Sequence, residues 1–246
     1  MSVLSKSRKS RKNPALIIFE REFKSYFTSP VAYIVTALFL IISGFMFFST
    51  FFLNNRAELR QFFGLLPIML SFFVPALTMR LFAEEKRSGS LETLMTLPVT
   101  EVDVVLGKYL ASLCGTLIML VPTIFYVITA EIFGSPDYGP IVGGYIGAIF
   151  LSAAYTAIGL FASSITKNQI IAFFTGFIIC IVLTLIDVFL VILPAPMVSF
   201  FSFISATSHF TSISRGIIDT RDLIYFISLT SLFFVITVKV QQTERN

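Results

Sequence analysis

The chain has 246 residues, of which 56% are hydrophobic and 13% charged, and its mean hydropathy is +0.88. Soluble domains carry about 25% charged residues, so this composition excludes an ordinary soluble protein and indicates a membrane protein. The formal net charge is +4, from 18 basic and 14 acidic side chains. The two cysteines, Cys114 and Cys180, lie inside apolar runs and are typical of small core residues rather than of a disulfide or a metal pair.

The first 30 residues precede any apolar run of membrane length. Residues 1–13 are a basic tail, which anionic lipid attracts at about 1 kcal/mol per base, and so short a tail beside a membrane helix argues against nucleic acid as a partner. Apolar side chains then recur at helical spacing: Leu16, Phe19, Phe23, Tyr26 and Phe27. This pattern predicts an interfacial helix over residues 14–29, with Asn13-Pro14 at its start. The alternative is a simple extension of the first span, but Ser29-Pro30 favours a break.

Six apolar stretches are long enough to cross a bilayer, which requires about 20 residues per helix. They cover residues 31–53, 62–82, 105–132, 141–166, 169–193 and 222–240. The first is too long for the core of a cleaved signal peptide, so we interpret it as a retained span. The sequence therefore predicts an all-α membrane protein with a single transmembrane domain over residues 1–246 and a six-span bundle over residues 31–240.

The distribution of lysine and arginine predicts the orientation of this bundle. With a cytoplasmic N-terminus, the cytoplasmic segments hold 14 of the 18 basic residues, and the outer segments hold Arg56, Arg60, Arg215 and Arg221. Both termini are therefore expected in the cytoplasm, together with the charged segment between the second and third spans.

The fourth span is rich in small side chains. Gly143 and Gly147 form a GxxxG pair, and Gly144, Ala148 and Ser152 continue the four-residue spacing. Small residues let membrane helices approach closely, so Gly143 and Gly147 are expected at a helix contact. The pattern leaves open whether the neighbouring helix belongs to the same subunit or to a second one.

Asp187 is an ionisable residue inside the fifth span, in the sequence LTLIDVFLVIL. A carboxylate there costs a few kcal/mol to insert, so one interpretation is an intramembrane polar site or a partner contact. The other is a structural acid near the outer end of the helix, hydrogen-bonded to serines of the following loop. That segment, residues 194–221, mixes aromatic with hydroxyl side chains and fits either a short re-entrant helical hairpin or an external loop, its aromatic content favouring the hairpin.

The sequence contains no catalytic or nucleotide-binding motif. Gly107-Lys108 is followed by Tyr109 rather than Ser or Thr, so it is not part of a phosphate-binding loop. There is no HExxH or CxxC pattern and no G-x-S-x-G elbow, and His209 has no second histidine with which to share a metal ion. We expect no enzymatic activity, no bound cofactor and no metal site in this chain.

The segment EEKRSGSLETLMTLPVT, residues 84–100, interrupts the apolar sequence with charges, glycine and proline. Ser88 or Ser90 is suited to cap a short helix that ends at Pro98. Thr100 and Asp103 then match a capping box at the start of the third span. The apolar side of the short helix needs a cover, which is either a socket in a cytoplasmic partner or the lipid headgroups.

Residues 73–113 (FVPALTMRLFAEEKRSGSLETLMTLPVTEVDVVLGKYLASL) resemble the corresponding region of ABC-2-type transporter permeases, and residues 159–173 and 208–226 continue the likeness. Within that family the chain is most similar to permeases of bacterial gliding-motility systems. The resemblance implies a coupling helix over residues 90–98 that inserts into a separate ATPase subunit. The implied contact residues are Glu84, Glu85, Lys86, Arg87, Gly89, Leu91, Glu92, Leu94, Leu97 and Pro98.

The resemblance further implies an ABC transporter subunit, an exporter, in the bacterial cytoplasmic membrane. The partner ATPase would bind ATP and Mg²⁺, and a second permease, identical or related, would complete the assembly among membrane lipids. Two other functions are compatible with six spans. A secondary transporter or channel would require more intramembrane charge and usually an internal repeat. A non-transporting anchor for a cytoplasmic complex would explain the charged segment but not the span architecture.

Overall fold

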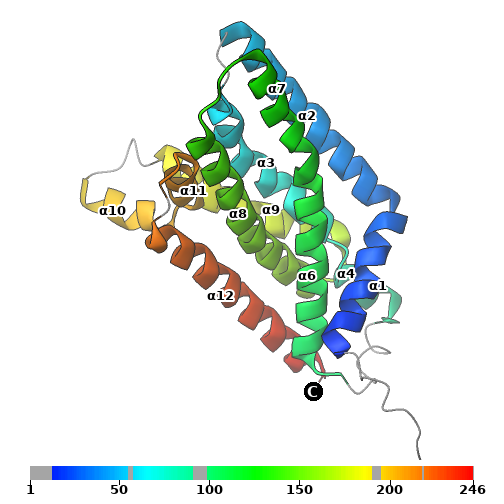
Figure 1. The fold of residues 1–246 in the computed structure, drawn as a ribbon. Coiled ribbons are helices and arrows are strands. Elements are labelled where there is room, and N and C mark those ends of the chain that lie inside the picture. The colour runs from blue at the N-terminus through cyan, green and yellow to red at the C-terminus, as the bar shows by residue number, and fades with distance from the viewer. Residues whose placement is uncertain (1–12, 55–57, 91–98, 190–194, 218, 246) are drawn as a thin grey trace, which may run out of the picture.

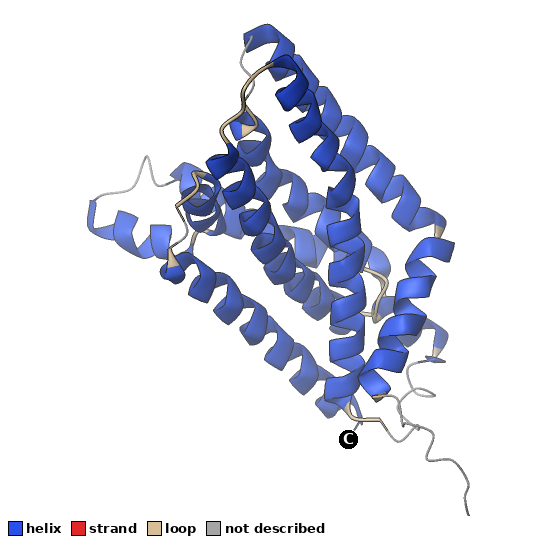
Figure 2. Ribbon diagram, viewed as in Figure 1, coloured by secondary structure: helices blue, strands red, loops and turns tan. Residues whose placement is uncertain are grey.

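The computed structural model describes residues 13–54, 58–90, 99–189, 195–217 and 219–245. These residues form helices and connecting turns, without any strand (Figure 2). The helices are α1 Pro14–Thr28, α2 Pro30–Asn54, α3 Arg60–Thr78, α4 Ala83–Ser88, α6 Glu101–Leu120, the 3₁₀ turn η1 Val121–Thr123, α7 Ile124–Phe133, α8 Tyr138–Ser164, α9 Gln169–Phe189, α10 Ala195–Ile204, α11 Ala206–Ser214 and α12 Thr220–Arg245.

Among the described residues, six helical segments are long and apolar enough to cross a membrane, which confirms the predicted all-α, six-span fold. They are Pro30–Phe52, Arg60–Ser88, Glu101–Phe133, Tyr138–Ser164, Gln169–Phe189 and Thr220–Thr243. Figure 1 shows α1, α4 and the C-terminal end of α12 at the same end of the bundle. We call this the inner end, in keeping with the orientation that the basic residues predict.

The fourth and second spans form the centre of the bundle. In the most apolar stretch of α8, 72% of the residues are buried, and in the corresponding stretch of the second span 61% are. In α2, α9 and α12 the share is 22%, 22% and 17%, so these helices present most of their apolar side chains outward. This distribution is typical of a membrane bundle, in which the outer faces of the peripheral helices contact lipid rather than water and therefore need no polar side chains.

The small residues of α8 allow this central position. A Cβ atom at Gly143 would collide with the carbonyl oxygen of Ile213 in α11, and one at Gly144 would lie 2.6 Å from the ring of Phe63 in α3. Gly147 packs against Phe210 of α11. All of these neighbours belong to the same chain, so the close approaches of the described structure are made within one subunit.

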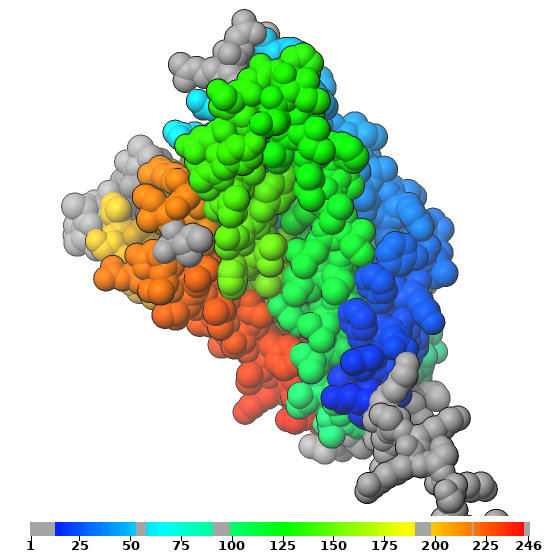
Figure 3. Space-filling view, in the orientation of Figure 1, coloured from blue at the N-terminus to red at the C-terminus, as the bar shows by residue number. Residues whose placement is uncertain are grey.

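The third span is two helices rather than the single one expected over residues 105–132. The 3₁₀ turn η1, which contains Pro122, separates α6 from α7. The two parts have different neighbours: α6 packs along α1, which lies directly against it in the space-filling view (Figure 3). Tyr126 of α7 instead stacks on Phe47 of α2, with ring centroids 4.8 Å apart. The span therefore touches α1 at one end and the first span at the other.

The start of the described chain and the segment after the fifth span are both helical. Ser29 has an extended backbone, with φ −88° and ψ 123°, and separates α1 from α2, so α1 is not an extension of the first span. Pro14 occupies the first turn of α1, although Asn13 makes no side-chain cap. The segment after the fifth span contains two short helices, α10 and α11, rather than an irregular loop, and α11 packs against α8.

Candidate functional site

Charged side chains from three helices meet at the inner end, where α1, α4 and the first turns of α6 come together. The position of α6 is fixed by the predicted capping box. Thr100 Oγ1 accepts the Asp103 amide at 3.2 Å, and Asp103 Oδ2 accepts the Thr100 amide at 3.3 Å. With the helix beginning at Glu101, Lys108 lies about two turns inside it, on the side that faces α1 and α4.

The Lys108 side chain is completely buried. Its Nζ lies 3.1 Å from Glu22 Oε1, 2.9 Å from Glu85 Oε2 and 2.7 Å from the carbonyl oxygen of Leu81. The centroid of the Phe82 ring is 5.2 Å from the same nitrogen. Burial of an ammonium group is costly unless the group is paired and hydrogen-bonded. Two carboxylates and a carbonyl meet that requirement here.

Arg21 connects this buried charge to the protein surface. Its Nη2 donates to Glu22 Oε1 at 2.5 Å and to Glu85 Oε1 at 2.8 Å. Burial alone would raise the pKa of the Glu22 carboxyl, but the cations of Lys108 and Arg21 outweigh this effect and hold it below its ordinary value of 4.5. We call the four residues Arg21, Glu22, Glu85 and Lys108 the charge junction. It joins α1, α4 and α6.

The α4 helix is also attached to α8. The backbone amides of Phe82 and Ala83 donate to Ser163 Oγ at 3.0 and 3.1 Å, and Lys86 Nζ donates to the carbonyl oxygen of Ser164. Ser164 is the last residue of α8, where free carbonyl groups and the helix dipole favour a cation. Three different helices therefore hold α4 in place.

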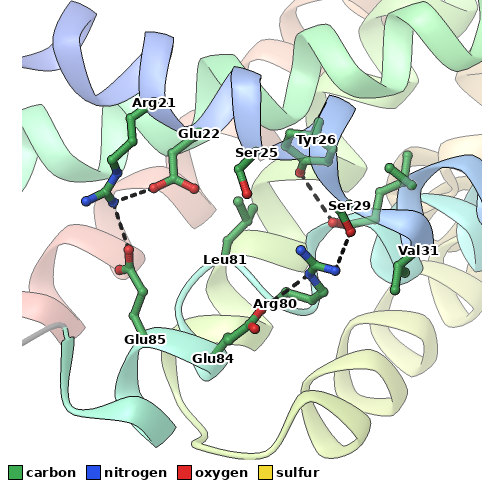
Figure 4. Close-up of a pocket in the computed structure, with 12 residues that line it drawn as sticks. Arg21, Glu22, Ser25, Tyr26, Ser29, Val31, Arg80, Leu81, Glu84 and Glu85 are labelled. Carbon is green, nitrogen blue, oxygen red and sulfur yellow. Dashed lines mark hydrogen bonds and ion pairs between the residues drawn. The ribbon is translucent and has the colours of Figure 1, made fainter.

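A cleft of about 320 Å³ lies beside the junction, between α1, the start of α2, the end of α3 and α4 (Figure 4). On one wall Arg80 Nη1 donates to Ser29 Oγ at 2.5 Å, and Arg80 Nε lies 3.4 Å from Glu84 Oε2. Tyr26 donates its hydroxyl proton to the carbonyl oxygen of Leu77 at 3.3 Å, and burial raises the pKa of this phenol above its ordinary value.

The structure divides the ATPase-contact residues that the family resemblance implies into three groups. Glu84, Arg87 and Gly89 are exposed, and Gly89 has a left-handed backbone, with φ 73°, directly after α4. Glu85 and Lys86 are half-buried and bind other helices of this chain. The remaining five, Leu91, Glu92, Leu94, Leu97 and Pro98, lie outside the described residues, as does most of the expected helix over residues 90–98.

Lys108 occurs in the sequence as one of 18 basic residues, beside a glycine but outside any phosphate-binding loop, and neither feature marks it as a functional residue. Two local signals were available. Its neighbours on the same helical face, Val104, Val105 and Ala111, are apolar, so the face that carries Lys108 is a buried one. A base on a buried face requires acidic partners. Of the two partners, Glu22 and Glu85, only Glu85 lies in the charged segment at residues 84–100.

The other predicted residues lie away from the junction. Gly143 and Gly147 lie in the half of α8 that contacts α11. Asp187 is half-buried near the end of α9 and forms no hydrogen bond or ion pair with the described part of the chain. His209 Nδ1 lies 2.6 Å from Asp222 Oδ1, and its ring stacks on Tyr225 at 4.1 Å. His209 thus links α11 to α12.

Comparison with known proteins places this architecture in a family. A model described as ABC-2 family transporter protein matches residues 55–239, which include α3, α4, the junction residues of α4 and α6, and all later spans. None of the curated proteins compared matches the chain. The family match covers most of the sequence, and six membrane-length helices accompany it. The chain belongs to the ABC-2 family of transporter proteins and is a multi-pass membrane permease of an ABC transporter.

Proposed function

We propose that this permease is an exporter in the bacterial cytoplasmic membrane and that a separate ATPase subunit drives it through α4 and residues 90–98. Both termini face the cytoplasm in this proposal. ATP and Mg²⁺ bind to the ATPase, and two permease copies, identical or related, enclose the transport path. The family match, which implies an ABC ATPase as partner, supports this assignment.

The attachment of α4 is the observation that carries the proposal. A segment that receives force from a partner must transmit it to the spans rather than bend alone. The α4 helix is bound to α1 and α6 through the charge junction and to α8 through Ser163 and Ser164. Displacement of α4 therefore displaces α1, the inner half of the third span and the end of the central helix together.

The proposed sequence of events follows from this attachment. ATP binding closes the two ATPase subunits, and the coupling segment moves with them. The charge junction conveys the movement to α1 and α6, while α3, which precedes α4 in the chain, tilts with it. Tilting of the second and third spans opens a path between the two permease copies. The 3₁₀ turn at Val121–Thr123 allows α6 to move without carrying α7 by the same angle.

The Leu94→Asp substitution tests the ATPase contact. Buried apolar anchors usually contribute more to binding than charges at the rim of an interface. We therefore expect Leu94→Asp to abolish copurification of the permease with a coexpressed ABC ATPase encoded beside its gene, and to abolish coupled ATP hydrolysis. Ile217→Asp places the same charge at an exposed apolar position at the other end of the molecule and should leave both unchanged.

Retention of the ATPase and of coupled hydrolysis by the Leu94→Asp protein would show that residues 90–98 are not the contact. Loss of the ATPase from both variants would show that the complex is sensitive to any added surface charge, which would also contradict the assignment.

A further inference from the structure

The cleft beside the charge junction lies where the uncharged stretches of the first and second spans end. Its apolar wall comes from Val31 and Ala32, in the first turn of the first span, and from Leu77, at the end of α3. No charged residue occurs in the sequence from Pro30 to Asn55 or from Gln61 to Met79, so charges begin at this level on both spans. The interior of the cleft is therefore continuous with the headgroup layer.

The polar wall of the cleft carries charges of both signs. Arg80 uses Nη1 and Nε in its contacts with Ser29 and Glu84, and its Nη2 donates no hydrogen bond to another described residue. The Glu84 side chain is 55% exposed, whereas that of Arg80 is 27% exposed. The guanidinium group of Arg80 and the more exposed carboxylate of Glu84 thus lie side by side as an ion pair, about 3.4 Å apart, at the edge of an apolar surface.

We propose that this cleft binds the headgroup of a phosphatidylethanolamine molecule of the surrounding bilayer. The headgroup phosphate accepts hydrogen bonds from Arg80, because planar guanidinium groups match phosphate oxygens. The primary ammonium donates to Glu84. The acyl chains leave the cleft past Val31, Ala32 and Leu77 into the lipid. The cleft volume of about 320 Å³ is within the range of small-ligand sites.

The charges of the cleft select among the common headgroups. Two basic residues, Arg21 and Arg80, and three acids, Glu22, Glu84 and Glu85, line it, and buried Lys108 balances the excess acid. A cleft without net charge gives no advantage to an anionic headgroup such as phosphatidylglycerol. Phosphatidylcholine carries a quaternary ammonium without N–H donors and is best held by a cage of aromatic rings, whereas Tyr26 is the one aromatic residue that lines this cleft.

This inference requires only a membrane-embedded chain and does not rest on the proposed export function. It assigns a ligand to the surface between the interfacial helix and α4. A bound headgroup would touch both elements and would therefore add to the attachment of α4 to the rest of the subunit.

Native mass spectrometry of the full-length chain in mild detergent tests the proposal. The protein is titrated with an equimolar mixture of phosphatidylethanolamine, phosphatidylcholine and phosphatidylglycerol. We expect one phosphatidylethanolamine to be retained in preference to the other two. Arg80→Gln should weaken this binding about tenfold, the effect of losing one charge-assisted contact. Arg87→Gln removes the same charge from an exposed position of α4 outside the cleft lining and should have no effect.

Two further arms keep the test decisive. Val31→Phe fills the apolar end of the cleft without changing any charge and should also abolish the preference, even if Arg80→Gln proves unable to fold. Soluble phosphoethanolamine at millimolar concentration should not displace the lipid, since it lacks acyl chains. Equal retention of the three lipids, unchanged binding by both cleft variants, or displacement by phosphoethanolamine would each overturn the proposal.

Discussion

At the scale of single residues, Lys108 is distinguished by complete burial next to two carboxylates. Replacement of a paired buried charge by a neutral side chain leaves its partners uncompensated, which costs about 3–5 kcal/mol. We expect Lys108→Ala to lower the free energy of unfolding by this amount, because Glu22 and Glu85 then lose their buried counter-ion and keep only the half-exposed Arg21 as a partner. Thermal denaturation of the detergent-solubilised chain measures the loss, and Lys167→Ala, an exposed lysine, serves as control.

A partial recovery of stability is expected when Lys108→Met is combined with Glu22→Gln and Glu85→Gln, since the triple variant leaves no buried charge at the junction and Arg21, whose side chain is 51% exposed, remains in contact with water. If Lys108→Ala melts at the same temperature as the Lys167→Ala control, the junction makes no contribution to stability.

The lowered pKa of Glu22 predicts a dependence of stability on pH. Its carboxyl binds a proton less readily in the folded chain than in the unfolded chain, where the pKa is near 4.5. The stabilisation is therefore fully present above that value and is lost as the pH falls through the lower, folded pKa. We expect the melting temperature to fall between pH 6 and pH 3 less steeply for Glu22→Gln than for the wild type.

Glu84→Gln is the matched control for this pH series, because the Glu84 carboxylate is more than half exposed. It should retain the pH dependence of the wild type. Identical slopes for Glu22→Gln and the wild type would contradict the predicted coupling between Glu22 and Lys108.

At the scale of elements, the contact between α8 and α11 predicts a clear difference between two glycines. A methyl group at Gly143 would collide with the backbone of Ile213 and would lie 3.0 Å from the Cα of Gly216, so the helices must separate. We expect Gly143→Ala to destabilise the chain by about 1–3 kcal/mol. Gly64→Ala adds the same methyl group where no atom lies within 4 Å and should be neutral or slightly stabilising. The melting temperatures of the two variants test this prediction, since only that of Gly143→Ala should fall.

The spans themselves could be predicted from the sequence because about 20 consecutive apolar residues have few alternative structures. The expected fifth span, residues 169–193, begins at the same residue as α9, and its last four residues, 190–193, lie outside the described residues. The division of the third span was missed. Hydropathy is continuous through Pro122, and proline is tolerated in the first turn of a new helix, so the sequence alone does not distinguish a break from a kink.

At the scale of the whole molecule, the pairing of Glu22 with Lys108 in the charge junction could not be predicted from the sequence. Glu22 and Lys108 are separated by 86 positions, and no periodicity relates them. Their proximity depends on α1 packing along α6, which in turn depends on the arrangement of the entire bundle. Each residue was visible as a charge near a membrane boundary, but the partner of each could be found only in three dimensions.

The predicted orientation has a direct test in the whole chain. In a background with Cys114 and Cys180 replaced by alanine, Ser88→Cys at the inner end should react with a membrane-impermeant maleimide only in inside-out vesicles. Tyr138→Cys, at an exposed position at the start of α8, should react only in right-side-out vesicles. The reverse pattern, with Ser88→Cys reacting only in right-side-out vesicles, would contradict a topology with both termini in the cytoplasm, and reaction of the two positions from the same side would contradict a third span between them.

The charge junction also imposes an order on biogenesis. Glu22 is synthesised 86 residues before Lys108, which corresponds to about 4–17 s of translation. During that interval Glu22 exists without the buried ammonium group of Lys108, and Glu85, which lies 23 residues before Lys108, is added only towards its end. The N-terminal third of the protein therefore reaches its final structure only after the third span has been inserted. A chain truncated before Lys108 lacks the residue that pairs with Glu22 and Glu85 and cannot form the charge junction.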